Sequence, residues 1–332
     1  MPKDKTMRVT AVFLAMLVII AVLGIVLVIF DNRRIDSMYG PEDFPRFLSE
    51  IPESYRAPCG RPGTLVPLAY ETYESFDYVN HSTPLTKTVW VYLPYGYDDS
   101  VRYNVFYMIH GGWGNETTTM GTADSPTEFK YIIDNAISEG EIEPLIMVFP
   151  TYNNVSSDDS ADHDLAVLLT RNYHNELIND LIPAVESRYS TYAESVSDEH
   201  LKASRDHRAF GGFSMGSVAT WYTFEYCLDY FRYFMPMSGD LTQNGEYLDR
   251  IVKNSGKRWS DFFILAMTSG KDFNAAEFST QISVMRRQTD SYRCADNERE
   301  GNLTFRIKEG AEHDASAMMT YSYNGLKWLW NH

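Results

Sequence analysis

The sequence predicts an α/β protein whose mostly parallel central sheet is covered by helices on both faces. Short runs rich in β-branched and aromatic residues alternate with segments of helical periodicity from residue 63 onward. That alternation is typical of strands joined by crossover helices. The 332 residues are 44% hydrophobic and 22% charged, which indicates a folded globular protein rather than a disordered one.

Eight runs are the candidate strands. They cover residues 64–70, 88–93, 105–109, 145–149, 209–213, 234–237, 262–267 and 304–307. The first two lie close enough together in the chain to form an antiparallel edge. Among the intervening segments, residues 175–189 are predicted to be helical, because five aliphatic residues fall on one face: Leu177, Ile178, Leu181, Ile182 and Val185.

The chain begins with a long apolar segment, residues 9–30, which has only two interruptions. A helix of this length would be roughly 33 Å long, about the thickness of a bilayer core. Lys3, Lys5 and Arg8 precede it, so the N-terminus is expected in the cytoplasm. We expect an uncleaved single-pass anchor in the cell membrane with an extracytoplasmic domain. The alternative is a cleaved signal peptide and a secreted protein, although Val-Ile-Phe-Asp-Asn is a poor cleavage site.

Three segments are therefore expected along the chain. They are an anchor or signal segment over residues 1–30, a polar linker over 31–58 and one globular domain over 59–332. The formal net charge of −16 argues against a nucleic-acid partner, because such partners are held by basic side chains on phosphates. The sequence does not indicate an oligomeric state.

Nothing in the sequence calls for a metal or a cofactor. Cys59, Cys227 and Cys294 form no C-x-x-C pair, so neither a disulfide framework nor a structural zinc site is expected. Residues 158–164 contain four aspartates and a histidine, and we interpret this segment as a solvated acidic loop.

The clearest chemical signal is Gly-Phe-Ser-Met-Gly at residues 212–216, directly after one predicted strand and before a helical run. This is the G-x-S-x-G nucleophile elbow in the strand–turn–helix context that it requires. The flanking glycines allow a tight, strained turn with no side chain beside the serine. The pattern predicts an α/β-hydrolase fold with Ser214 as the nucleophile.

A serine nucleophile needs a base that is oriented by an acid, and in this fold the chain order is serine, acid, histidine. His313 lies in a loop just after the last predicted strand and is the expected base. Asp272 follows the preceding strand and is the preferred acid. Asp240 occupies a similar position one strand earlier and is the alternative acid or a pocket residue.

Acyl transfer also requires hydrogen-bond donors for an oxyanion. We expect one from the backbone N–H of Met215, which follows the nucleophile. The other is expected from His-Gly-Gly-Trp-Gly at residues 110–114, with Gly112 as the first choice and Trp113 as the next. His110 is interpreted as a brace for this loop.

Trp113 and Tyr152 lie near predicted strand ends and are candidates for stacking on a sugar or phenolic ring, with core packing as the alternative.

Residues 58–332 resemble the esterase D-type α/β-hydrolases, in particular the feruloyl and acetyl-xylan esterases of carbohydrate esterase family 1. The resemblance rests on the elbow spelling Phe-Ser-Met-Gly and on several further segments. These read Pro-Cys-Gly at 58–60, Val-Tyr-Leu-Pro-Tyr-Gly-Tyr at 91–97, His-Gly-Gly at 110–112, His-Asn-Glu-Leu at 174–177, Asp-Leu-Ile-Pro at 180–183, His-Arg at 207–208 and Met-Pro-Met-Ser-Gly at 235–239.

The resemblance implies Ser214 as nucleophile, Asp272 as acid, His313 as base, and Gly112 and Met215 as oxyanion donors. It also implies cofactor-free hydrolysis of feruloyl or acetyl esters on plant xylan. The chain departs from many relatives where Asp-Ala-Ser-Ala, instead of an aromatic residue, follows His313.

The sequence as a whole predicts a serine esterase whose substrate is an acylated carbohydrate. Two alternatives remain open at this stage. One is an envelope acyltransferase of the mycolyl-transferase type, which would hand the acyl group to a sugar instead of water. The other is a non-catalytic carbohydrate-binding or scaffolding protein on a hydrolase fold.

Overall fold

An eight-stranded sheet forms the centre of the computed structural model, which describes residues 42–330. Its spatial order is β1-β2-β4-β3-β5-β6-β7-β8, and pairing is antiparallel between β1, β2 and β4 and parallel elsewhere. All eight predicted strands and the antiparallel edge are confirmed. The strands are β1 (Thr64–Tyr73), β2 (Pro84–Leu93), β3 (Val105–Ile109), β4 (Ile146–Phe149), β5 (Arg208–Phe213), β6 (Tyr233–Met237), β7 (Phe263–Ser269) and β8 (Leu303–Lys308).

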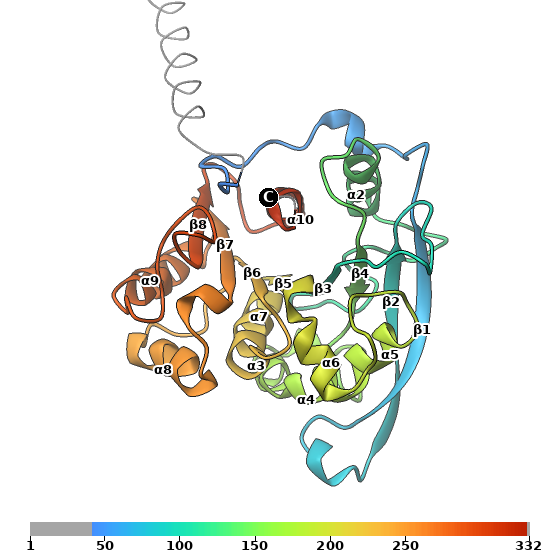
Figure 1. The fold of residues 1–332 in the computed structure, drawn as a ribbon, viewed down its shortest axis with the longest axis horizontal. Helices are drawn as coiled ribbons and strands as arrows, with labels where there is room; N and C mark the ends of the chain where they lie inside the picture. Colours follow the sequence, from blue (N-terminus) through green and yellow to red (C-terminus); the bar gives the residue numbers. More distant parts are fainter. Residues whose placement is uncertain (1–41, 331–332) are drawn as a thin grey trace, which may run out of the picture. The chain divides into compact units, whose positions relative to one another are not determined.

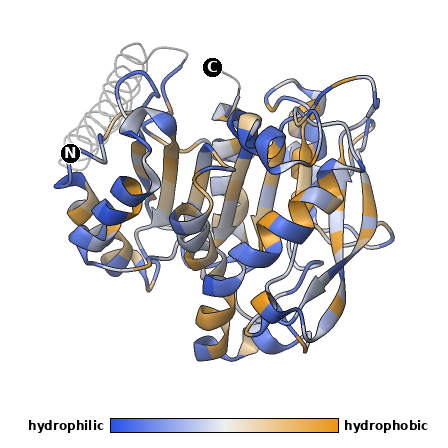
Figure 2. Ribbon diagram, turned by 60° about the horizontal axis from the view of Figure 1, so that its bottom comes forward, coloured by the Kyte–Doolittle hydropathy of each residue, from blue (hydrophilic) through white to orange (hydrophobic). Residues whose placement is uncertain are grey.

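Helices cover both faces of this sheet, as predicted (Figure 1). One face carries α2 (Glu128–Ser138) and α10 (Ala315–Trp328). The other carries α3 (His163–Asn172), α4 (His174–Glu176), α5 (Ile182–Glu186), α6 (Asp198–Ala203), α7 (Met215–Tyr226), α8 (Gly245–Ser255) and α9 (Ala275–Arg286). Figure 2 shows that the central strands are largely hydrophobic whereas the helices carry both hydrophilic and hydrophobic stripes. Each helix can therefore bury its apolar stripe on the sheet.

The chain crosses from β3 to β4 in one direction and from β4 to β5 in the other, so the loops after β3 and β5 meet at a switch point in the sheet. In open α/β sheets, ligands bind in the crevice at the carboxyl ends of strands at such a point. The oxyanion loop predicted after β3 and the serine predicted after β5 are brought to that position.

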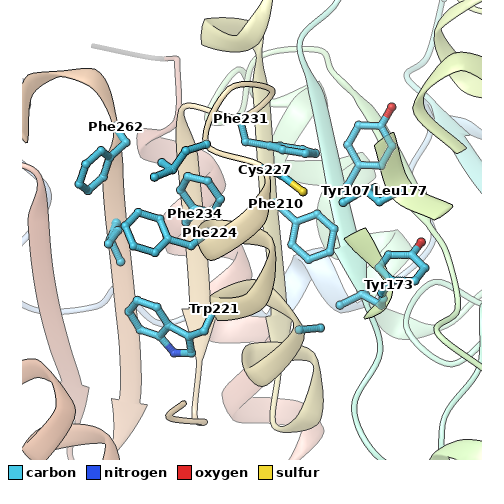
Figure 3. Close-up of a cluster of buried hydrophobic side chains, with 14 of the residues drawn as sticks. Tyr107, Tyr173, Leu177, Phe210, Trp221, Phe224, Cys227, Phe231, Phe234 and Phe262 are labelled. Atoms are coloured by element: carbon cyan, nitrogen blue, oxygen red, sulfur yellow. The ribbon is translucent and has the colours of Figure 1, made fainter. Parts of the chain in front are cut away.

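Aromatic packing holds α7 against the sheet (Figure 3). The ring of Phe224 lies 5.1 Å from that of Phe234 on β6 and 5.0 Å from that of Phe262, both edge-on. Trp221 is completely buried in the same cluster. Each large apolar side chain buried in this way contributes roughly 1.5–3 kcal/mol, so α7 is fixed firmly in place.

The predicted helix over residues 175–189 is present as far as Glu186 and contains one π-helical turn. The structure has α4, then a π-helical turn over Leu177–Leu181, then α5, which ends at Glu186. Pro183 lies in the first turn of α5 and has no backbone N–H, which removes one regular helical hydrogen bond.

The predictions for residues 1–30 and for most of the linker lie outside the described residues. Among residues 42–330, no helix is both long and apolar enough to cross a bilayer. The chain divides into Met1–Pro45 and Arg46–His332, so residues 46–58 of the predicted linker belong to the same unit as the sheet. Within that unit Tyr55 is buried, and the side-chain amide of Asn135 donates hydrogen bonds to the carbonyls of Tyr55 and Ala57.

Candidate active site

Ser214 lies on the sharp turn between β5 and α7, with a left-handed backbone of φ 60° and ψ −121°. Glycine is required at both flanking positions because there is no room for a side chain. A Cβ at Gly212 would lie 2.5 Å from the carbonyl oxygen of Gly216, and a Cβ at Gly216 would lie 2.5 Å from the carbonyl oxygen of Ile109. The elbow predicted from the sequence is therefore present in its backbone geometry.

His313 and Asp272 form a hydrogen-bonded pair at the ends of neighbouring strands. The Nδ1 of His313, in the loop between β8 and α10, lies 2.8 Å from Oδ2 of Asp272. The Asp272 side chain is fully buried, and its Oδ1 accepts a hydrogen bond of 2.8 Å from the backbone N–H of Asn274. Burial raises the pKa of Asp272, but the hydrogen bonds from His313 and Asn274 outweigh burial and hold this pKa below its usual value.

Two aromatic rings flank His313. The Phe213 ring lies 4.4 Å from the imidazole by centroids, and the Phe273 ring lies 4.4 Å from it as well. Phe213 directly precedes Ser214, so this contact brings the histidine beside the elbow. Within residues 42–330 the Ser214 hydroxyl makes no hydrogen bond, to His313 or to another group. Such bonds are often long without substrate and tighten in the reacting complex.

The structure separates the two candidate acids. Asp240 accepts hydrogen bonds from the amides of Asn274 (2.9 Å) and Gln243 (2.8 Å) and lines the pocket beside Ser214. Asp272 is the carboxylate that contacts His313. The structure thus places the preferred acid against His313 and the alternative acid in the pocket wall, and the roles of both stay predictions.

The Gly111–Gly112 peptide is held by its carbonyl. The oxygen of Gly111 accepts hydrogen bonds from Nδ1 of His110 (2.7 Å) and from the hydroxyl of Tyr152 (2.9 Å). In a trans peptide the N–H points away from the preceding carbonyl. The Gly112 N–H is therefore directed away from the carbonyl that Tyr152 binds, and Gly112 itself lines the pocket.

This loop approaches the elbow closely, since a Cβ at Gly111 would lie 3.3 Å from that of Ser214. Met215 is the first residue of α7, where a backbone N–H has no acceptor within the helix. The N–H of Trp113 donates to the carbonyl of Ser160 at 3.0 Å and is not available to an oxyanion. The geometry thus favours Gly112 and Met215 over the alternative donor Trp113.

His110 is a neutral brace. Its Nδ1–H donates to the Gly111 carbonyl, so its Nε2 accepts the hydrogen bond of 2.8 Å from the Thr151 hydroxyl. Burial lowers the pKa of His110 to about 4. Tyr152 stacks on this imidazole at 4.4 Å and is only 2% exposed. The prediction that Tyr152 contacts substrate is therefore wrong: its hydroxyl is used beneath the loop, and its ring is covered.

The pocket next to Ser214 has a volume of about 510 Å³. Two aromatic residues at its wall are well exposed, Trp113 at 82% and Phe273 at 75%. Trp113 was predicted, whereas Phe273 was missed, and its position directly after Asp272 was the available signal. The remaining wall is mainly apolar or small, and includes Ala161, Val167, Met215, Val218, Tyr222 and Leu241.

Two of the four aspartates of residues 158–164 bind local backbone N–H groups. Asp159 accepts hydrogen bonds from the N–H groups of Asn154 and Ser156, and Asp162 caps α3 by accepting from the N–H of Leu165. Within the described part of the chain, no group of three or more side chains is arranged to hold a metal ion.

Comparison with known proteins shows the family of this chain. The family model named Esterase matches residues 81–294, and the chain belongs to that family. It is 36% identical over 286 residues to endo-1,4-beta-xylanase Y of Acetivibrio thermocellus, covering 84% of this chain and 24% of that protein. It is 32% identical over 148 residues to an endo-1,4-beta-xylanase/feruloyl esterase of Xylanibacter ruminicola, covering 42% of this chain and 18% of that protein. The chain thus spans about a quarter or less of the length of these relatives.

Solved structures share the fold. A mutant of the feruloyl esterase module from Clostridium thermocellum, complexed with sinapinate, has a TM-score of 0.74 and 35% identity, over 88% of this chain and 96% of that one. A ferulic acid esterase from Anaeromyces mucronatus, in complex with ferulic acid, shares the fold at 19% identity and a TM-score of 0.61, over 84% and 96% of the two chains. The chain is thus a member of the esterase family, and it resembles the feruloyl esterase module from Clostridium thermocellum over nearly the whole length of that module.

Removing the Tyr152 hydroxyl tests the brace. Tyr152→Phe keeps the ring on His110 but leaves one donor instead of two on the Gly111 carbonyl. We expect kcat for ester hydrolysis to fall by roughly tenfold with KM little changed, which is less than the hundredfold or greater loss when an oxyanion donor itself is removed. The measurement is steady-state kinetics of Tyr152→Phe and of a control variant, Tyr78→Phe. The control removes a tyrosine hydroxyl that donates to Asp180 and does not contact the oxyanion loop. An effect on KM alone would contradict the assigned role.

The lowered pKa of His110 predicts a pH effect on stability. The unfolded chain protonates this residue near its ordinary pKa of 6.5, whereas the folded protein does so only near 4. Stability is therefore lost as pH falls between these values, by roughly 3 kcal/mol in total. Urea unfolding of His110→Gln should show a flatter dependence on pH over this interval, while the exposed His163→Gln should follow the wild type. An unchanged slope in His110→Gln would refute the prediction.

Proposed function

We propose that this protein is a serine esterase that removes feruloyl or acetyl groups from plant polysaccharide, xylan in particular. The observation that carries the proposal is the His313–Asp272 pair, placed beside a strained Ser214 by the ring of Phe213. Ser214, Asp272 and His313 follow the chain order of nucleophile, acid and base that this fold uses, and each comes after the end of a strand.

In the proposed reaction, the Ser214 hydroxyl attacks the ester carbonyl while Nε2 of His313 takes its proton. Asp272 accepts the hydrogen bond from Nδ1 of His313, fixes the tautomer and stabilises the imidazolium. The N–H groups of Gly112 and Met215 donate to the oxyanion. His313 then protonates the departing alcohol, and water attacks the acyl-serine with His313 as base, which releases the carboxylic acid and restores Ser214.

The pocket lining is suited to an acyl group with a flat apolar part. Its wall is mostly apolar, and Trp113 and Phe273 offer exposed rings for stacking. The related module from Clostridium thermocellum binds sinapinate, a phenolic acid of this shape. The relatives are esterases, which favours transfer of the acyl group to water over transfer to a sugar. We also propose that residues 9–30 anchor the enzyme in the membrane with its site outside the cytoplasm.

This function is tested by measuring the hydrolysis of methyl ferulate and of a simple acetyl ester by the full-length chain, both as wild type and as Ser214→Ala. We expect serine-dependent release of ferulate and a loss in Ser214→Ala of roughly four orders of magnitude or more, because the triad acts as a unit. Ser283→Ala, at an exposed serine of α9, is the matched control and should keep full activity.

Circular dichroism should show the same fold in all three proteins. Wild-type rates in Ser214→Ala would disprove the assignment of the nucleophile. Hydrolysis of the acetyl ester alone would keep the triad and exclude feruloyl specificity.

A further inference from the structure

A second cavity, of about 410 Å³, lies between the C-terminal end of α7 and the neighbouring helix α8. We call it the α7–α8 cavity. It is separate from the catalytic pocket, which lies at the N-terminal end of α7. Its polar and aromatic lining residues are Glu225, Tyr226, Asp229, Tyr247, Arg250 and Asn254.

A row of tyrosines connects the two cavities along α7. Tyr222 lines the catalytic pocket, and Tyr226, one helical turn further, lines the α7–α8 cavity. Their rings are nearly parallel, with centroids 6.4 Å apart and an angle of 13° between the planes. Residues four apart lie on one face of a helix, and this face differs from the one that sends Trp221 and Phe224 into the core (Figure 3).

The charges around the α7–α8 cavity nearly cancel. Asp229 is paired with Lys257 at 2.6 Å, which leaves Glu225 and Arg250 as one negative and one positive group. A cavity with balanced charge gives no preference for an ionic ligand. The protein as a whole carries −16 and repels polyanions.

The polar groups of the lining can bind hydroxyls. Burial and a hydrogen bond to Glu225 raise the pKa of Tyr247, so this carboxylate and this phenol interact within the lining. The Asn254 amide and the Arg250 guanidinium supply further polar groups suited to sugar hydroxyls, and tyrosine rings are suited to the apolar faces of a sugar.

We infer that the α7–α8 cavity binds uncharged sugar residues of the polysaccharide that carries the ester, with Tyr222 and Tyr226 joining it to the catalytic pocket. This inference rests on the proposed function, because it assigns the cavity to the same polymeric substrate. The site affects the capture of polymer and leaves the chemistry at Ser214 unchanged.

Kinetics on two substrates test the inference. Tyr247→Ala/Arg250→Ala changes only α8 residues that lie outside the catalytic pocket. We expect kcat/KM on feruloylated arabinoxylan to fall by roughly tenfold, equivalent to about 1.4 kcal/mol, and kcat/KM on methyl ferulate to stay unchanged. Tyr95→Ala, at a tyrosine that is 58% exposed elsewhere, is the matched control. Equal losses on both substrates, or none on the polymer, would overturn the inference.

Calorimetry separates this inference from the proposed function. Full-length Ser214→Ala should bind xylohexaose, and adding Tyr247→Ala/Arg250→Ala should weaken binding by a similar factor. Absent or unaltered binding would overturn the inference. If the wild type hydrolyses neither methyl ferulate nor an acetyl ester, the proposed function fails, while the calorimetry still decides whether the cavity binds sugar.

Discussion

The backbone at Ser214 is the constraint on which the site depends. A positive φ at a residue other than glycine costs on the order of 1–3 kcal/mol and persists only where the surroundings enforce it. Here α7 enforces it, because Ser217 and the Trp221 indole both donate hydrogen bonds to the carbonyl of Gly239 at the end of β6. The aromatic packing of α7 contributes enough to offset that strain, so the serine is presented at the sheet edge by the core beneath it.

The oxyanion loop depends on a second buried network. His110 and Tyr152 hold one peptide carbonyl, and the Thr151 hydroxyl is hydrogen-bonded to the other ring nitrogen of His110. The carbonyl of Thr151 in turn accepts a hydrogen bond of 2.9 Å from Lys87 on β2, whose ammonium is paired with buried Glu176. Removing one member of a buried ion pair is strongly destabilising, so this pair ties the antiparallel edge to the oxyanion loop.

Much of this arrangement could be predicted from local sequence. Strand periodicity located the sheet, and the order of motifs along it indicated Ser214, Asp272 and His313. Side-chain direction at strand ends could not be predicted, because it depends on tertiary packing. Tyr152 therefore proved to be a brace instead of a pocket wall, and Phe273 was missed. The contact with His313 that distinguishes Asp272 from Asp240 likewise exists only in the folded sheet.

The proposed mechanism depends on Ser214 being the activated nucleophile. Labelling the full-length protein with a fluorophosphonate probe, followed by intact-mass measurement and peptide mapping, shows which hydroxyl is reactive. We expect a single adduct, located on Ser214, and none in Ser214→Ala. An adduct on another residue, or equal labelling of Ser214→Ala, would rule out this assignment.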